Sequence, residues 1–98
     1  MQVKIRMEVE RDLGEAAVFY NSRSNGVGDA YLAYMNEELA ALSETAGIHR
    51  EIHGCHRKLV KRFPYAIYYL VHAEVVDVVA VLHQRRGLQY VERRLTDL

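Results

Sequence analysis

The chain has 98 residues, of which 50% are hydrophobic and 27% charged, and its thirteen basic residues balance thirteen acidic ones. This composition is typical of one soluble globular domain, and the length is enough to bury a core without disulfides or a structural metal. The single cysteine excludes an internal disulfide, and no apolar run reaches the ~18–20 residues that span a bilayer, so we expect neither a signal peptide nor a membrane-spanning segment. We therefore expect one domain over residues 1–98, located in the cytoplasm without membrane contact.

The first half of the chain carries the patterns of one strand and two helices. Apolar and polar residues alternate over residues 3–7, which predicts a half-buried strand. A pattern resembling a capping box begins at Asp12 and predicts a helix to about Arg23. The glycine-containing segment 22–29 breaks this helix, and apolar spacings of three and four then predict a second helix over residues 29–47. The short link between them predicts an antiparallel helical hairpin.

The second half is typical of three strands followed by a short helix. Residues 48–56 are ambiguous between loop and strand. The three strands are expected at about residues 57–63, 65–72 and 75–84, with a short, labile terminal helix at 88–95 after Gly87. Both faces of the strand at 65–72 are apolar, which predicts that it is central and covered on both sides. In the last strand, alternation predicts one face made of Val76, Val78, Ala80 and Leu82.

The order of these elements, β-α-α-β-β-β, favours an α+β fold over a doubly wound parallel sheet, because strands and helices do not alternate. We expect a mostly antiparallel sheet with the helical hairpin packed on one of its faces. Charge is divided between the two halves. Residues 1–46 carry four basic and eight acidic groups, whereas residues 47–98 carry nine basic and five acidic groups. Such asymmetry suggests contact with a polyanion, although an acidic helical layer and a basic sheet would also serve solubility alone.

A set of cationic side chains flanks the three strands and is the main candidate for a binding site. Its members are Arg57, Lys58, Lys61, Arg62, His83, Arg85 and Arg86. Because successive strands of a meander reverse direction, we expect groups from its two open ends to share one end or face of the sheet. Arginine and lysine would bind phosphates, His83 could move protons near neutral pH, and Tyr90 could stack on a base. The alternative is that these charges only protect strand edges from aggregation.

The remaining candidate residues are expected to have structural rather than catalytic or metal-binding roles. His49 is followed closely by His53, Cys55 and His56, which are residue types that bind zinc. A zinc site would also need a second paired motif, which the sequence lacks. We therefore expect no metal and no cofactor. As a lone cysteine without a supporting His–Asn or His–Asp context, Cys55 is expected to be inert rather than a nucleophile. Core and rim packing is the expected role of Tyr20, Tyr31, Tyr34, Tyr65, Tyr68 and Tyr69.

Two segments resemble the RelE/ParE superfamily of bacterial toxins. They are RKLVKRFPYAIYY at residues 57–69 and VAVLHQRR at residues 79–86. The front half is similar too, with a first strand, a helix opening at Asp12, Tyr20, and a Gly-Val-Gly break before a long helix. The resemblance covers nearly the whole chain and implies a RelE/ParE-like fold. It also implies the toxin of a type II toxin–antitoxin module, of the kind found in plasmid stabilisation cassettes, masked by a cognate antitoxin that folds over it.

The superfamily implies two alternative targets. ParE-like members poison DNA gyrase without a catalytic set, whereas RelE-like members cut mRNA in the ribosome without metal. The RFPY and HQRR segments look closer to the ParE-like branch, and Gln84 stands where a RelE-like catalytic arginine is expected. We therefore expect a gyrase poison whose cationic set binds its target. In the RelE-like alternative, the active site would comprise Lys58, Lys61, Arg62, Arg86 and Tyr90. A third possibility is an inactive relative that serves as a protein-interaction module.

Overall fold

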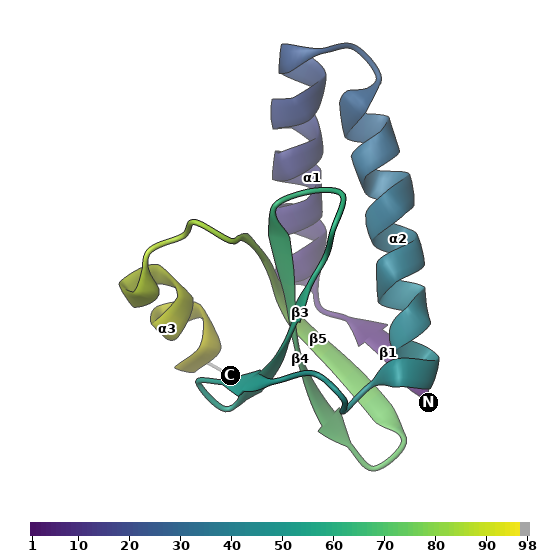
Figure 1. Cartoon of the computed structure of the whole chain (residues 1–98), viewed down its shortest axis with the longest axis vertical. Coiled ribbons are helices and arrows are strands. Elements are labelled where there is room, and N and C mark those ends of the chain that lie inside the picture. Colours follow the sequence, from purple (N-terminus) through teal and green to yellow (C-terminus); the bar gives the residue numbers. More distant parts are fainter. Residues whose placement is uncertain (97–98) are drawn as a thin grey trace.

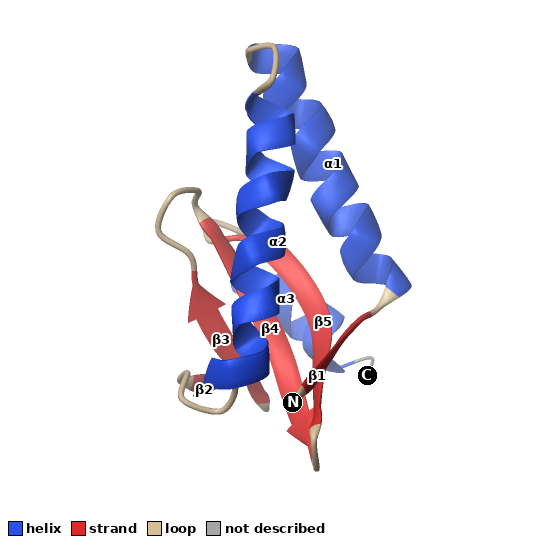
Figure 2. Cartoon of the chain, turned by 90° about the vertical axis from the view of Figure 1, so that its right-hand side faces the viewer, coloured by secondary structure: helices blue, strands red, loops and turns tan. Residues whose placement is uncertain are grey.

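The computed structural model describes residues 1–96, so the last two residues of the predicted domain lie outside the described part. In chain order the elements are β1 (Gln2–Ile5), α1 (Met7–Arg23), α2 (Val27–Thr45), β2 (Glu51–Ile52), β3 (Cys55–Leu59), β4 (Tyr65–His72), β5 (Val75–His83) and α3 (Leu88–Thr96). The strands form one sheet in the order β1-β5-β4-β3-β2, antiparallel except for the parallel β1–β5 pair. The α1–α2 hairpin packs on one face of the sheet and α3 on the other (Figures 1 and 2). The predicted α+β class is confirmed.

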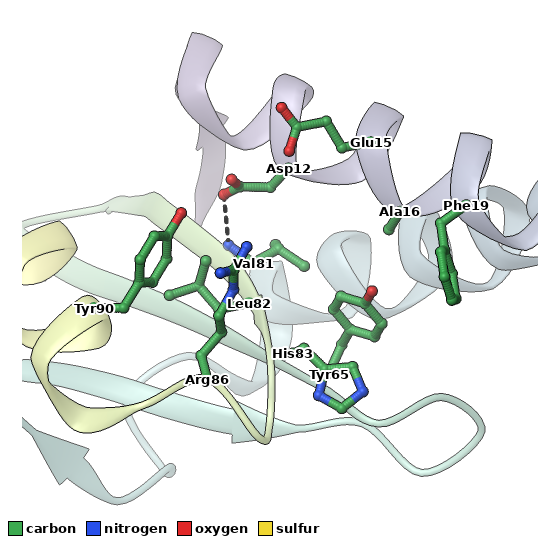
Figure 3. A pocket seen from close by; sticks show the side chains of 10 residues that line it. All are labelled: Asp12, Glu15, Ala16, Phe19, Tyr65, Val81, Leu82, His83, Arg86 and Tyr90. Carbon is green, nitrogen blue, oxygen red and sulfur yellow. Dashed lines mark hydrogen bonds between the residues drawn. The ribbon is translucent and has the colours of Figure 1, made fainter.

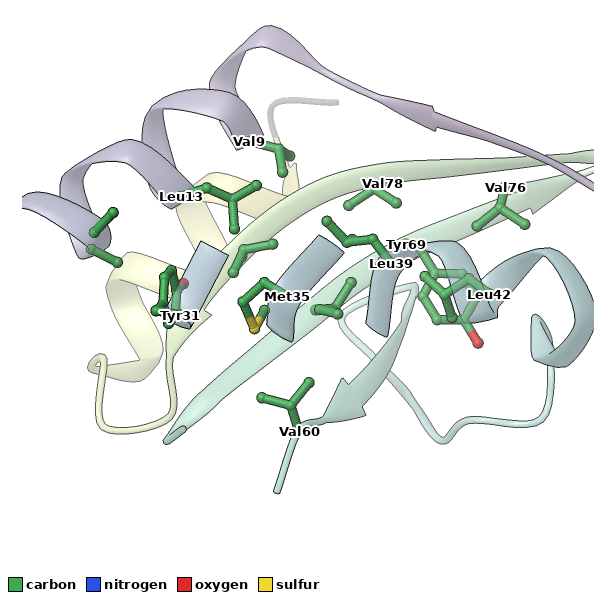
Figure 4. Close-up of a cluster of buried hydrophobic side chains, with 14 residues drawn as sticks. Val9, Leu13, Tyr31, Met35, Leu39, Leu42, Val60, Tyr69, Val76 and Val78 are labelled. Atoms are coloured by element: carbon green, nitrogen blue, oxygen red, sulfur yellow. The ribbon is translucent and has the colours of Figure 1, made fainter. Parts of the chain in front are cut away.

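The larger core lies between the helical hairpin and the sheet (Figure 4). Both helices turn one apolar stripe inward, as their spacings of three and four residues predicted. The buried side chains of this layer include Val9, Leu13, Met35, Leu39, Leu42, Tyr69, Val76 and Val78. Burying this surface is the main favourable contribution to folding in a chain of this size. None of the helices described in residues 1–96 is long and apolar enough to cross a membrane.

A smaller core lies on the opposite face, under α3. Val91 and Leu95 of α3 pack against Tyr68 and neighbouring small residues of β4 and β5. The prediction that the strand at 65–72 is covered on both sides is therefore confirmed. The predicted face of β5 is wrong beyond Val78, because the register shifts between the Tyr69–Val78 and Tyr68–Ala80 pairs. This β-bulge reverses the alternation, so that Ala80 faces α3 while Val76 and Val78 face the hairpin.

Several predicted boundaries also need correction. Helix α1 begins at Met7 rather than near Asp12, because the inward positions Val9 and Leu13 continue the helical spacing one turn earlier. The alternation over residues 3–7 was too short to place the end of the strand, and β1 stops at Ile5. The strand predicted at 57–63 instead starts at Cys55 and ends at Leu59. The basic residues that follow it therefore lie in a turn.

The hairpin bend depends on a close approach of the two helices at Gly28. Its backbone N–H donates to Oδ1 of Asn21 at 2.7 Å, which joins the end of α1 to the start of α2. A Cβ atom at position 28 would lie 2.1 Å from the carbonyl oxygen of Ala17 and 2.6 Å from Cγ of Asn21. The absence of a side chain at this position is thus what allows the helices to pack so closely.

We expect the substitution Gly28→Ala to lower the free energy of unfolding by about 1–3 kcal/mol, because the backbone of α1 must move to admit the methyl group. The matched control is Gly14→Ala, also within a helix, where a Cβ would meet nothing within 4 Å. That control should instead stabilise the protein by roughly 0.5–1 kcal/mol, since alanine favours a helix over glycine. Urea denaturation of both variants measures the difference, and equal stabilities would contradict the role of Gly28.

Candidate functional site

The site is organised by an unpaired strand edge. Strand β1 pairs with β5 only as far as Ile5 and Val78, so in the described sheet the outer edge of β5 beyond Val78 has no neighbouring strand. Helix α1 crosses this edge instead. Oδ2 of Asp12, on the inner side of α1, accepts a hydrogen bond from the backbone N–H of Val81 at 3.0 Å. A side chain thus satisfies a backbone donor that would otherwise be buried without a partner.

The same carboxylate also holds the C-terminal helix. Nη1 and Nη2 of Arg94, in α3, donate to the two oxygens of Asp12 at 2.9 and 2.8 Å, which makes a bidentate ion pair. The side chains of Asp12 and Arg94 are only 11% and 22% exposed. This hydrogen bonding raises the pKa of Arg94 above its usual value. Asp12 therefore joins α1, β5 and α3 at one point, which we call the Asp12 clasp.

A cleft opens beside the Asp12 clasp (Figure 3). It has a volume of about 180 Å³, and it lies between α1, the end of β5 and the beginning of α3. Its lining residues are Asp12, Glu15, Ala16, Phe19, Tyr65, Val81, Leu82, His83, Arg86 and Tyr90. A second hollow of about 360 Å³ shares the Phe19, Tyr65, His83 and Arg86 walls and adds Tyr20 and Arg85. The two hollows therefore adjoin through these shared residues, and both have aromatic and cationic side chains in their lining.

Arg86 and Tyr90 are the most clearly positioned pair in the cleft. The guanidinium carbon of Arg86 lies 4.1 Å from the ring centroid of Tyr90, a cation–π contact that orients the charge. Arg86 forms no ion pair with a side chain within residues 1–96. Nearby, Nδ1 of His83 accepts the backbone N–H of Arg85 at 3.0 Å, and the His83 ring contacts Tyr65 at 5.3 Å between centroids. These contacts define a cationic and aromatic rim.

The prediction that the whole cationic set shares one end or face is wrong for Arg57 and Lys58. Both lie in the middle of β3, opposite Tyr68 and Ile67 of β4, whereas the end of β5 lies opposite Tyr65 at one end of the sheet. Nζ of Lys58 donates to the backbone oxygen of Glu38 at 2.8 Å, beneath α2. Nε of Arg57 donates to the hydroxyl of Tyr68 at 3.2 Å, on the face that α3 covers.

Lys61 and Arg62 do share a sheet end with the cleft. They lie in the turn between β3 and β4, where the Tyr34 hydroxyl accepts both of their backbone N–H groups. The N–H of Gln84 donates to the oxygen of Pro64 at 2.8 Å, which places this turn beside the end of β5. Neither Lys61 nor Arg62 lines the cleft itself. The structure therefore places four cations at one sheet end, and only two of them, Arg85 and Arg86, line the cleft.

The histidines near Cys55 hold a loop in place. The Tyr69 hydroxyl is hydrogen-bonded to Nδ1 of His49 at 2.5 Å and accepts the N–H of Gly47 at 3.0 Å. Nδ1 of His56 bonds to the backbone oxygen of His49 at 2.7 Å, and its ring stacks on Tyr69. Cys55 is buried on the other face of the sheet, where desolvation raises the pKa of its thiol. Across the described chain, no three or more His, Cys, Asp or Glu side chains come together in a group that could hold a metal ion.

The tyrosines form packing contacts, as predicted. Tyr31 is fully buried, with its ring centroid 5.1 Å from both Phe63 and Tyr65 and 5.4 Å from Tyr20. Its hydroxyl has no hydrogen-bond partner among the described residues, and burial raises its pKa. Tyr34 occupies the rim, while Tyr68 and Tyr69 pack on opposite faces of β4. This aromatic cluster supports the floor of the cleft through Tyr65.

Comparison with known proteins agrees with this architecture. A mostly antiparallel sheet packed by a helical hairpin is the RelE/ParE-like fold that the sequence resemblance implied. The model for the "ParE toxin of type II toxin-antitoxin system, parDE" matches residues 3–88. The chain therefore belongs to the ParE toxin family, as the sequence resemblance implied.

Solved structures are similar in fold. Among seven matching chains is one from the "Chromosomal ParDE TA system from P. aeruginosa". It superposes with a TM-score of 0.73 at 18% identity and covers 85% of this chain and 95% of that one. At this identity the likeness establishes the fold alone. Comparison with curated protein sequences gave no match.

We expect Asp12→Ala to lower the free energy of unfolding by about 2–4 kcal/mol, because it leaves the Val81 N–H and the Arg94 charge without partners. The matched control is Asp12→Asn, which keeps an oxygen for the Val81 N–H and should cost less. Urea denaturation gives the energies, and hydrogen exchange in α3 shows whether the helix detaches. Unchanged α3 protection in Asp12→Ala would contradict the proposed link.

The His49–Tyr69 contact predicts a pH dependence. Burial lowers the pKa of His49, and the nearby charges of Lys58 and His56 lower it further. The neutral His49 therefore contributes stability that is complete above the unfolded pKa of about 6.5, and that is lost as pH falls through the lower folded pKa. Between about pH 7.5 and 5, the wild type should lose more stability than His49→Gln, which cannot titrate in this range. Parallel pH dependences of the two proteins would exclude this contribution.

Proposed function

We propose that this toxin arrests growth by binding and poisoning DNA gyrase, and that a cognate antitoxin neutralises it. The observation that carries the proposal is the cationic sheet end formed by Lys61, Arg62, Arg85 and Arg86. None of these four forms an ion pair with a side chain in residues 1–96. Arg86 is also oriented by Tyr90 above a cleft. Cations held in this way suit an acidic protein surface or phosphates on a gyrase–DNA complex.

The arrangement favours a binding role over the RelE-like nuclease alternative. Metal-independent cleavage would require several cationic groups around one scissile phosphate. Of the five residues considered for that role, Lys58 is tied to Glu38 beneath α2, and neither Lys61 nor Arg62 lines the cleft with Arg86 and Tyr90. At the position where a catalytic arginine was expected, the Gln84 amide donates to the oxygen of Tyr65 at 3.0 Å. The Gln84 side chain therefore links the end of β5 to β4.

Antitoxin binding is supported by the family and by the surface of the chain. Large apolar side chains are left exposed at several points around the sheet and hairpin, among them Ile48, Leu59 and Leu88. An antitoxin segment that folds on binding would cover such side chains and pair with the neighbouring cations. The bound antitoxin would also block access of the target to the cationic sheet end.

The test is supercoiling by purified gyrase in the presence of the toxin. We expect the wild type to inhibit supercoiling and to trap cleaved DNA, and the double variant Arg85→Ala/Arg86→Ala to lose at least tenfold in potency. Truncating even one charge that a partner buries costs about 2–5 kcal/mol, so a tenfold loss is the smallest effect expected. The matched control is Arg93→Ala, a cation of α3 that does not line the cleft.

Two results would overturn the proposal. One is unaffected gyrase together with new mRNA 5′ ends inside translated codons after induction of the toxin alone, which would establish the nuclease. In that case Tyr90→Phe should abolish cleavage, whereas a gyrase poison should tolerate the loss of this hydroxyl. The other is normal growth with the unpaired toxin, which would support an inactive relative that acts as an interaction module.

A further inference from the structure

The outer face of α1 is apolar and uncovered by the rest of the described chain. Met7, Val18 and Phe19 are 69%, 70% and 49% exposed, which is unusual for side chains of this size. Between them, the missing side chain of Gly14 leaves a shallow hollow of about 470 Å³, lined by Arg11, Gly14, Glu15 and Val18. The buried residues of α1 all lie on the opposite face. This outer stripe therefore contributes nothing to the core of its own chain.

The charges on this stripe are arranged symmetrically about its middle. Arg11 and Glu15 lie four residues apart, hence one above the other on the same flank of the helix. Neither forms an ion pair with another side chain in the described residues. Their midpoint is position 13, and Met7 and Val18, which lie about three turns apart on the same side of the helix, flank it. This side of α1 thus carries a cation and an anion between two apolar groups.

We propose that the toxin forms a symmetric dimer in which α1 packs antiparallel against α1 of a second copy. A twofold axis near position 13 places Arg11 of each copy opposite Glu15 of the other, and Met7 opposite Val18. Each contact then occurs twice, as in any isologous interface. The hollow at Gly14 lies near the axis, where the two helices approach most closely.

Charge complementarity is the reason to favour a second copy over another partner. A surface that carries one sign of charge requires a partner of the opposite sign. Here the cation and the anion exchange places under the twofold rotation, so the stripe is complementary to itself. Glu15 also lines the cleft, so the dimer contact would adjoin the cleft in both copies. The inference does not depend on the identity of the toxin's target.

Sedimentation velocity of the full chain without antitoxin tests the dimer from micromolar to hundreds of micromolar protein at low salt. We expect the wild type to dimerise. Arg11→Glu and Glu15→Arg should each weaken self-association by roughly tenfold or more, because two attractive pairs become two repulsive ones. An equimolar mixture of the two variants should restore the dimer, since each then presents the charges that the other lacks. The control Glu37→Arg has the same charge change on α2 and should leave the dimer intact.

Circular dichroism checks that every variant is folded, and all the substituted side chains are exposed. A wild type that remains monomeric over the whole range overturns the proposal. So does a dimer that survives both single reversals, which would lie on a different surface. Failure of the mixture to re-form a dimer equally contradicts the antiparallel pairing of Arg11 with Glu15.

Discussion

The structure depends on how one strand edge is completed. Strand β1 is four residues long and leaves β5 unpaired beyond Val78, where the backbone N–H of Val81 would lie without a partner. A longer first strand would complete the ladder, but the chain turns into α1 at Met7 instead. Asp12 then supplies the missing acceptor from the helix. Because the same carboxylate binds Arg94, one side chain completes the sheet, fixes α1 across its edge and anchors α3.

The cleft is a consequence of this arrangement. It exists where α1 leaves the sheet edge and α3 is drawn towards it, and its walls come from both helices and from the end of β5 (Figure 3). The direction of the strands then determines which cationic side chains lie near the cleft. The β3–β4 turn brings Lys61 and Arg62 to this end, whereas Arg57 and Lys58 pair mid-sheet with Tyr68 and Ile67. The result is a compact cationic end of the sheet beside the cleft.

Much of the fold could be predicted from the sequence, because long periodic patterns specify their elements strongly. The helical spacing of α2 and the doubly apolar β4 are examples. The site was harder to predict for identifiable reasons. A β-bulge cannot be recognised in an uninterrupted run of apolar residues. The alternation therefore predicts the wrong face of the sheet for Ala80 and Leu82. Asp12 resembles a helix cap in sequence, and its contacts with Val81 and Arg94 span 69 and 82 residues. Such a contact is fixed by topology rather than by local pattern.

Hydrogen exchange at the Val81 amide tests most directly whether Asp12 completes the edge of β5. If the carboxylate replaces a strand partner, this N–H should exchange as slowly as core amides of the paired strands, such as that of Ile67, although no strand pairs with it on that side in the described sheet. Exchange at the rate of an open strand edge would contradict the account, because the cleft and the anchoring of α3 would then have to rest on some other contact.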